Sequence, residues 1–266
     1  MIFKIIFKNK TNSKAPFRGL GVNKANFLPF KMFGVNNTNS KAPFRGLGVV
    51  IFLFLMLSMS VSAVELDSKN RDTKYVQSIV ERSQKNVEKL ALKDTILYRN
   101  VLNIIANKYF TLNDIYTKRD TAISQIKRST LAGEAKNSAM QAAQNEKEAA
   151  LYRSHFAFAS DLSLYINESQ IEAVKDAMTY GVVKVTYDAT LDMIPTLQEK
   201  EKSQIMAWLK EAREFAVDAE NSNKKHEAFG KYKGRINNYL SKRGYNLVKE
   251  REAWYKRIEA KKQNIK

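Results

Sequence analysis

The sequence predicts an all-α protein, a helical bundle-like single domain with a long Ala-rich helix, preceded by a signal peptide. Two observations lead to this prediction. Residues 64–266 contain five glycines and the single proline Pro195, and so few helix breakers favour helices, because sheets need many tight turns. Apolar residues in the same range recur every three or four positions, which is the spacing of an amphipathic helix.

The first 63 residues form a leader that we separate from the helical domain at 64–266. They carry nine basic residues and no acidic one, which is half of the formal charge of +18. An apolar h-region at 49–59 precedes Val61-Ser62-Ala63, so we expect cleavage after Ala63 and export to the periplasm, the outer surface or the medium. The alternative is an uncleaved leader that anchors the protein, because about 20 apolar residues span a bilayer.

The leader also contains a duplication. The segment TNSKAPFRGLGV occurs at 11–22 and again at 38–49 without a mismatch. Two short copies cannot form a solenoid, which needs at least three repeats that share a core. We interpret the duplication as a DNA-level repeat, with either Met1 or Met32 as the start of translation.

We expect seven helices in the domain, at 70–92, 94–118, 121–165, 168–180, 197–219, 222–242 and 246–263. The first two follow apolar stripes, such as Val76, Ile79 and Val80 in the first. The third has nine alanines between Ala132 and Ala159 and few large apolar residues, so we expect it to pack closely or project as an arm.

Local signals mark the later elements. Asn167-Glu168-Ser169-Gln170 and Thr196-Leu197-Gln198-Glu199 are capping boxes that begin the fourth and fifth helices. Between these helices, the segment at 181–188 alternates apolar and polar residues. A lone strand cannot form a sheet, so we expect an extended link or a continued helix there.

Basic charge is concentrated at the C-terminal end, where 224–266 holds 14 basic and four acidic residues. In a cytosolic protein, this charge with interspersed aromatic residues would indicate nucleic acid. Because the leader predicts export, we expect no nucleic acid partner and an anionic polymer such as an acidic polysaccharide instead. The alternative is a basic helix face that only keeps the protein soluble.

Motifs for metal binding and catalysis are missing from the sequence. There is no cysteine, and His155 and His226 have no second ligand at metal-binding spacing, so we expect no metal and no cofactor. Asp188 and Asp192 would share one face of a helix. They are the only weak candidates for the pair of carboxylates that a glycosidase needs, and we favour a protein that is not an enzyme.

Three segments resemble one family: KDAMTYGVVKVTYDATLDMIP at 175–195, QIMAWLKEAREFAVDAENSNKKHEAFGKYKGRINNYLSKRGYNL at 204–247, and YFTLNDIYTKRD at 109–120. The family is the bacterial domain of unknown function 3826, typical of Bacteroidetes. The resemblance implies an exported helical body that is associated with polysaccharide utilisation, and it brings no catalytic residues with it. Shorter elements at 90–96, 165–171 and 197–205 are similar to helix starts in Spy and CpxP periplasmic chaperones.

We therefore expect a non-catalytic binding or accessory protein of acidic glycan utilisation. In this hypothesis Lys231, Lys233 and Arg235 pair with uronate carboxylates while Tyr232 or Trp254 stacks on a sugar ring. The alternatives are a glycan lyase or hydrolase that uses Asp188, Asp192 or Tyr187, and a Spy/CpxP-like chaperone. The full set of candidate ligand-binding residues is Tyr180, Tyr187, His226, Lys231, Tyr232, Lys233, Arg235, Asn237 and Trp254.

Overall fold

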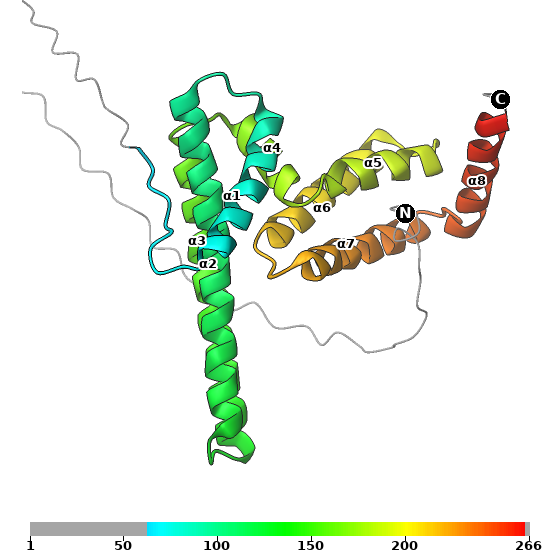
Figure 1. Ribbon diagram of the computed structural model, residues 1–266. Helices are drawn as coiled ribbons and strands as arrows, with labels where there is room; N and C mark the ends of the chain where they lie inside the picture. The colour runs from blue at the N-terminus through cyan, green and yellow to red at the C-terminus, as the bar shows by residue number, and fades with distance from the viewer. Residues whose placement is uncertain (1–62, 264–266) are drawn as a thin grey trace, which may run out of the picture. The chain divides into compact units, whose positions relative to one another are not determined.

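The computed structural model describes residues 63–263, and this part of the chain is all-α, as predicted (Figure 1). The leader's h-region and duplication lie outside the described residues. The helices within that range are α1 (Thr73–Val87), α2 (Thr95–Arg128), α3 (Gly133–Ser163), α4 (Glu168–Met178), α5 (Val182–Met193), α6 (Glu199–Val217), α7 (Ser222–Lys242) and α8 (Leu247–Gln263), with a short 3-10 turn, η2 (Glu88–Leu90), after α1.

The largest differences from the predicted helix boundaries lie at the junction of α2 and α3 and at the end of α1. The expected break between 118 and 121 is wrong, because α2 continues to Arg128 and the chain turns before Gly133, whose φ of 55° suits glycine. The polar residues around 118–121 are all compatible with a helix and do not end it. The first expected helix stops at Val87, and the 3-10 turn after it ends at Ala91 in the left-handed region, with φ 49°.

The segment at 182–188 is helical, as the second of the two expectations for it required, but it begins a new helix, α5, and does not continue α4. Tyr180 and Gly181 both have positive φ, 63° and 66°, and they separate α4 from α5. The capping box at Asn167 is confirmed, with Gln170 as its partner. The expected cap at Thr196 is wrong, because Gln198 caps α6 and forms the box with Glu201.

The long helices α2 and α3 pack side by side as a hairpin, whose connecting turn extends beyond the other helices in Figure 1. Only Ala143, Phe158 and Leu162 of α3 are buried. The Ala-rich helix therefore packs closely on α2 and contributes little to the core, as its composition predicted. The main core lies at the other end of the hairpin, where Ile105 of α2, Leu162 of α3 and Val174 of α4 are fully buried together.

The helices α5 to α8 are joined by specific polar contacts as well as by packing. Trp254 of α8 is 2% exposed, and its Nε1 donates a hydrogen bond to Oδ2 of Asp192 at 2.6 Å. Tyr245 donates its hydroxyl to Oε2 of Glu201, also at 2.6 Å. These bonds attach α8 and its preceding loop to α5 and α6. None of the helices in 63–263 is long and apolar enough to cross a membrane.

Candidate functional site

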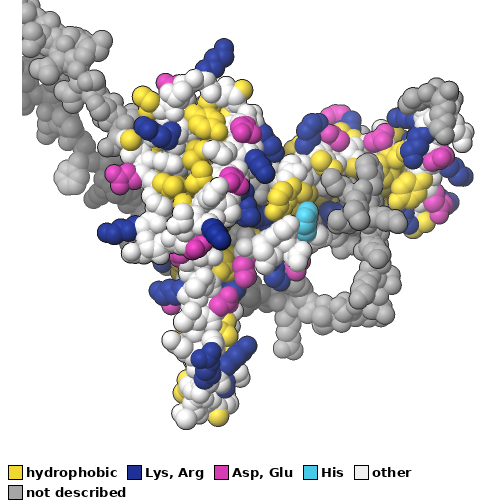
Figure 2. Space-filling view, in the orientation of Figure 1, with side chains coloured by type: hydrophobic (Ala, Val, Ile, Leu, Met, Phe, Trp, Pro, Cys, Tyr) yellow, Lys and Arg dark blue, Asp and Glu magenta, His cyan; other side chains and the backbone are white. Residues whose placement is uncertain are grey.

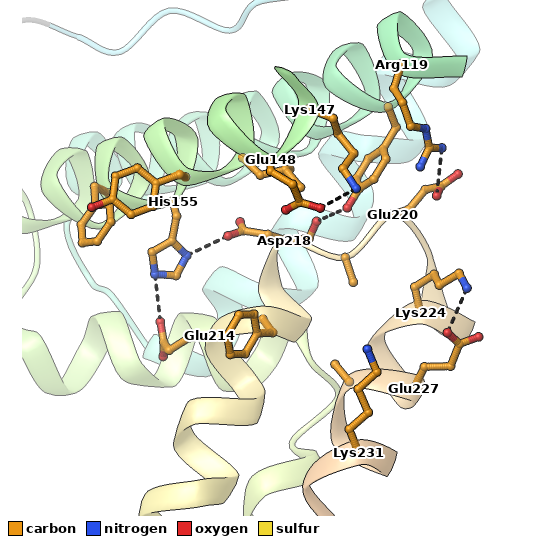
Figure 3. A pocket seen from close by; sticks show the side chains of 17 residues that line it. Arg119, Lys147, Glu148, His155, Glu214, Asp218, Glu220, Lys224, Glu227 and Lys231 are labelled. Carbon is orange, nitrogen blue, oxygen red and sulfur yellow. Dashed lines mark hydrogen bonds and ion pairs between the residues drawn. The ribbon is translucent and has the colours of Figure 1, made fainter. Parts of the chain in front are cut away.

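An open pocket of about 680 Å³ lies where α3, α6 and α7 face one another, with two residues of α2 at its edge. The α3 helix contributes Tyr152, His155 and Phe156. These residues share one face of the helix, because positions three and four apart are neighbours on a helix surface. The opposite wall comes from α6 and α7, and Figure 3 shows their side chains directed toward the same space.

A chain of ion pairs forms the floor of this pocket. Lys108 Nζ lies 2.6 Å from Oδ1 of Asp218, and His155 Nδ1 lies 2.7 Å from Oδ2 of the same carboxylate. The other ring nitrogen of His155 lies 3.4 Å from Oε2 of Glu214, so the imidazole bridges Glu214 of α6 and Asp218, which follows the end of that helix (Figure 3). Lys108 is also held by the hydroxyl of Ser154, to which it donates at 2.9 Å.

The ion pairs continue below the pocket toward α4. Lys175 Nζ lies 2.7 Å from Oε2 of Glu214, and Arg213 contacts Oε1 of the same residue at 3.0 Å. Arg213 is 2% exposed and also reaches Asp176 at 2.9 Å and Glu172. Four helices are thus connected by one network in which each buried cation has an acidic partner, which is the condition for burying charges without a large penalty.

The network sets the protonation states of the site. Hydrogen bonds to Asp218 and Glu214 raise the pKa of His155 to about 9, so the ring is a cation at neutral pH with both N–H groups directed at carboxylates. Burial alone would raise the pKa of Glu214, but bonds from His155 and Lys175 outweigh it and lower the pKa to about 2. His155 cannot serve as a base here, and Glu214 holds no proton to give.

Above this closed network, the rim of the pocket is aromatic and open to water. Tyr152, Phe156 and Phe215 are 68%, 57% and 62% exposed. The rings of Tyr152 and Phe156 meet edge to face at 4.8 Å between centroids, and Phe215 stacks on Tyr232 at 6.2 Å. Large rings clustered in contact with water are typical of a binding surface, whereas single exposed apolar residues are ordinary.

The charged residues at the rim are nearly balanced. Lys147 pairs with Glu148, Lys224 with Glu227, and Arg119 with Glu220. Lys231 is exposed, has no ion pair within 63–263, and its ammonium points toward the pocket in Figure 3. Basic and acidic side chains are likewise interspersed on the face shown in Figure 2. Lys231 is therefore the cation of the pocket that is available to a ligand.

The structure brings some of the predicted site residues together and separates others. Lys231 lines the pocket and Tyr232 stacks on Phe215 at its rim, whereas Arg235 covers the ring of Trp208 at 4.5 Å and pairs with Glu211 at 3.2 Å. Lys233 and Asn237 are partly buried on α7, and burial lowers the pKa of Lys233. The rings of Tyr180 and His226 stack on each other at 5.9 Å, away from this pocket.

Three candidates on α5 and α8 have structural partners. The proposed stacking role of Trp254 is wrong, because a ring that is 2% exposed offers no face to a ligand. Asp192 accepts the hydrogen bond of that ring, and Asp188 pairs with Lys184 at 2.6 Å. Tyr187 is partly buried on α5. In the part of the chain that the structure describes, no cluster of three acidic, His or Cys residues could hold a metal ion.

Sequence reasoning missed the aromatic rim and the ionic floor. A signal for the rim was present, since Tyr152, His155 and Phe156 are large residues on one face of an otherwise Ala-rich helix. Phe215 also lies outside the apolar stripe of its helix, which runs through Leu209, Ala212 and Ala216. The floor had no such signal, because Lys108 and Asp218 are 110 positions apart and either could have faced water.

Comparison with protein families places most of the chain in a family. A family model described as a protein of unknown function, DUF3826, matches residues 76–260, which includes all the residues of the pocket. Comparison with curated proteins gives no match.

Proposed function

The chain belongs to the DUF3826 family, and from this premise we propose that it is exported and binds an acidic glycan, without cleaving it, in the pocket between α3, α6 and α7. The observation that supports this proposal most is the aromatic rim: Tyr152, Phe156 and Phe215 are each more than half exposed around one pocket. Amphipathic sugar rings stack their C–H faces on such side chains, and each ring contact excludes water from both surfaces.

A preference for acidic sugars follows from the charge of the pocket. The other cations of the rim are paired with carboxylates, so Lys231 is the one that can bind a uronate carboxylate without losing an acidic partner. The ammonium of Lys231 can pair with one carboxylate, and a uronate residue carries one. The basic residues of 224–266 add long-range attraction for a polyanion, and this attraction weakens as salt screens it.

The protonation states argue for binding and against hydrolysis. A glycosidase needs one protonated carboxyl as general acid and a second carboxylate as base or nucleophile. Glu214 has a pKa of about 2 and is ionised at any physiological pH, and His155 has both N–H groups engaged. Neither Glu214 nor His155 is therefore a proton donor tuned to neutral pH, whereas both hold the floor on which the recognition groups stand.

A binding titration tests this proposal. The full protein is titrated with polygalacturonate and with an uncharged glucan at low and high salt, and the same samples are analysed for new reducing ends and unsaturated products. We expect salt-sensitive binding of polygalacturonate only, without products. Lys231→Ala should weaken this binding about tenfold, the loss of one charge-assisted contact, and Phe215→Ala should weaken it as well.

Lys242→Ala is the matched control, because Lys242 is an exposed lysine of the same helix outside the pocket. Equal losses of polygalacturonate affinity in the Lys231 and Lys242 variants would mean that only the net charge of the protein matters. This result would overturn the assignment of glycan binding to the pocket. Release of new reducing ends or unsaturated products would show that the protein cleaves the glycan, and would favour the enzyme alternative over the binding proposal. Suppression of aggregation of an unfolded client without glycan binding would favour the chaperone alternative.

A further inference from the structure

A second cavity, of about 990 Å³, lies between α1, α2, the α4–α5 junction and the start of α7. Tyr116 and Glu220 line both this cavity and the aromatic pocket, so the two spaces are neighbours. Tyrosines line the second cavity as well, among them Tyr109 and Tyr180. The cavity is distinguished from the aromatic pocket by the basic side chains that line it.

Four cations line this cavity. Arg82, Lys85 and Lys89 are three and four positions apart and share one face of α1 and the turn that follows it, and Lys225 comes from α7. None of the four has an ion pair with a described residue. Arg82 lies over the ring of Tyr109, with its guanidinium carbon 5.6 Å from the centroid.

The acidic residues of the cavity do not neutralise these cations. Asp120 and Glu220 both bind Arg119, at 2.7 and 3.2 Å. Glu81 accepts a hydrogen bond from Gln77 at 3.1 Å and is the remaining carboxylate among the lining residues. The four cations of the lining therefore face three carboxylates, two of which are already paired with Arg119 outside the lining, so the cavity keeps an excess of positive charge.

Lys225 is the most unusual of these cations because it is 6% exposed. Its Nζ donates to the carbonyl oxygen of Met178 at 2.9 Å, and it lies 5.8 Å from the ring centroid of Tyr109. An ammonium has three protons to donate, and burial without a carboxylate is costly. Burial, together with the like charges of Arg82 and Lys108, lowers the pKa of Lys225 to about 8 although Asp218 opposes this.

A further feature of the wall favours an anion. The first turn of α7 borders the cavity through Asn221 and Ser222, and a helix N-terminus carries partial positive charge, although the Asn221 side chain already accepts the N–H of Lys224. Tyr180, with φ 63°, also borders the cavity. That conformation places the Tyr180 ring at the cavity, stacked on His226.

We propose that this cavity is a separate binding site for a multiply charged oxyanion, a phosphate or sulfate group, with Lys225 as its inner contact and Arg82 and Lys85 as its outer contacts. The proposal does not depend on glycan binding in the aromatic pocket. The bound group could be free inorganic anion or could be carried by a sugar, since both present the same oxygens to the same donors.

Calorimetric titration of the full protein with inorganic phosphate, inorganic sulfate and a sugar phosphate tests the proposal. We expect saturable one-to-one binding that Lys225→Met weakens at least tenfold, because methionine keeps the length of the side chain and removes its charge. Arg82→Gln should weaken binding severalfold. Tighter binding of the sugar phosphate than of the free anions would identify a sugar-borne group, and equal binding would identify the free anion.

Lys74→Met is the matched control, because Lys74 is an exposed lysine of α1 that does not line the cavity. It should leave anion binding within twofold of the original protein. Absence of saturable binding by all three probes, or equal affinity of the Lys225→Met variant, would overturn the proposal. Lys231→Ala and Phe215→Ala should leave anion binding unchanged, so failure of this site and failure of the glycan pocket are distinguishable.

Discussion

Replacing Asp218 by asparagine removes the charge that compensates a buried lysine. Lys108 Nζ lies 2.6 Å from Oδ1 of Asp218, and the two side chains are 2% and 13% exposed. After Asp218→Asn, the ammonium keeps its bond to Ser154 and can still donate to the new amide oxygen. The variant therefore loses the charge of the partner and keeps much of the geometry.

The expected cost is about 3 to 5 kcal/mol of unfolding free energy, the usual range for breaking a buried pair from one side. The upper limit has its own physical origin. At pH 7, a lysine whose usual pKa is about 10.4 can lose its proton for about 5 kcal/mol, at 1.36 kcal/mol for each pH unit. A greater penalty at Lys108 would be avoided by deprotonation, so the share of the cost that falls on this lysine cannot rise much beyond this value, and loss of the His155 pair adds to it.

Urea unfolding followed by far-ultraviolet circular dichroism measures this cost, and a double-mutant cycle isolates the pair. Lys108→Met in the Asp218→Asn background should recover much of the loss, with a coupling energy above about 1 kcal/mol. Glu211→Gln is the control on the same helix, because its pair with Arg235 is about half exposed and should contribute at most about 1 kcal/mol. Additive single changes, or a cost of Asp218→Asn no greater than that of Glu211→Gln, would refute the reasoning.

Three further predictions concern pH, the attachment of α8 and backbone strain. The pKa of His155 is raised to about 9, so the protonated ring stabilises the fold fully below pH about 6.5, and this contribution disappears as pH rises through about 9. The urea concentration at the unfolding midpoint should therefore fall across this pH range for the original protein and change less for His155→Gln. Trp254→Phe keeps a ring but removes the donor to Asp192 Oδ2, and should cost about 1.5 to 3 kcal/mol; an unchanged urea midpoint would contradict this. Ala91→Gly removes a left-handed alanine at φ 49° and should raise stability by about 1 kcal/mol, seen as a melting temperature higher by about 2 to 4 °C; a lower melting temperature would mean that the strain is already relieved.

Much of the fold could be predicted because helices depend on near neighbours in the chain. Sparse glycine and proline, apolar spacing and the cap at Asn167 identified the helical segments. The errors arose where the local sequence is compatible with more than one backbone conformation. The residues around 118–121 can continue a helix or end one, and α2 continues because its face remains packed on α3. Alternation at 181–188 is compatible with a short helix as well as with an extended segment.

The candidate sites depended more on tertiary structure than the fold did. Residue types alone selected Lys231 and Tyr232, which lie at the aromatic pocket, but they selected Trp254 equally, which is buried. Solvent exposure distinguishes an aromatic ring that can bind a ligand from one that packs in the core. This exposure depends on which faces of the helices meet. Phe215 is open to water because α3 and α7 leave a space above it.

By itself the sequence determined the all-α class, the helical segments, the family and the excess of basic residues at the C-terminal end, since each of these is written in local patterns or in composition. Only the tertiary structure decided which charges are paired. Asp218 meets Lys108 and His155 because α2, α3 and the end of α6 converge, while Lys225 is buried beside the carbonyl oxygen of Met178 and has no ion pair with a described residue. Charge pairing over such separations depends on how helices pack, and this decides which cations hold the fold together and which are available to a ligand.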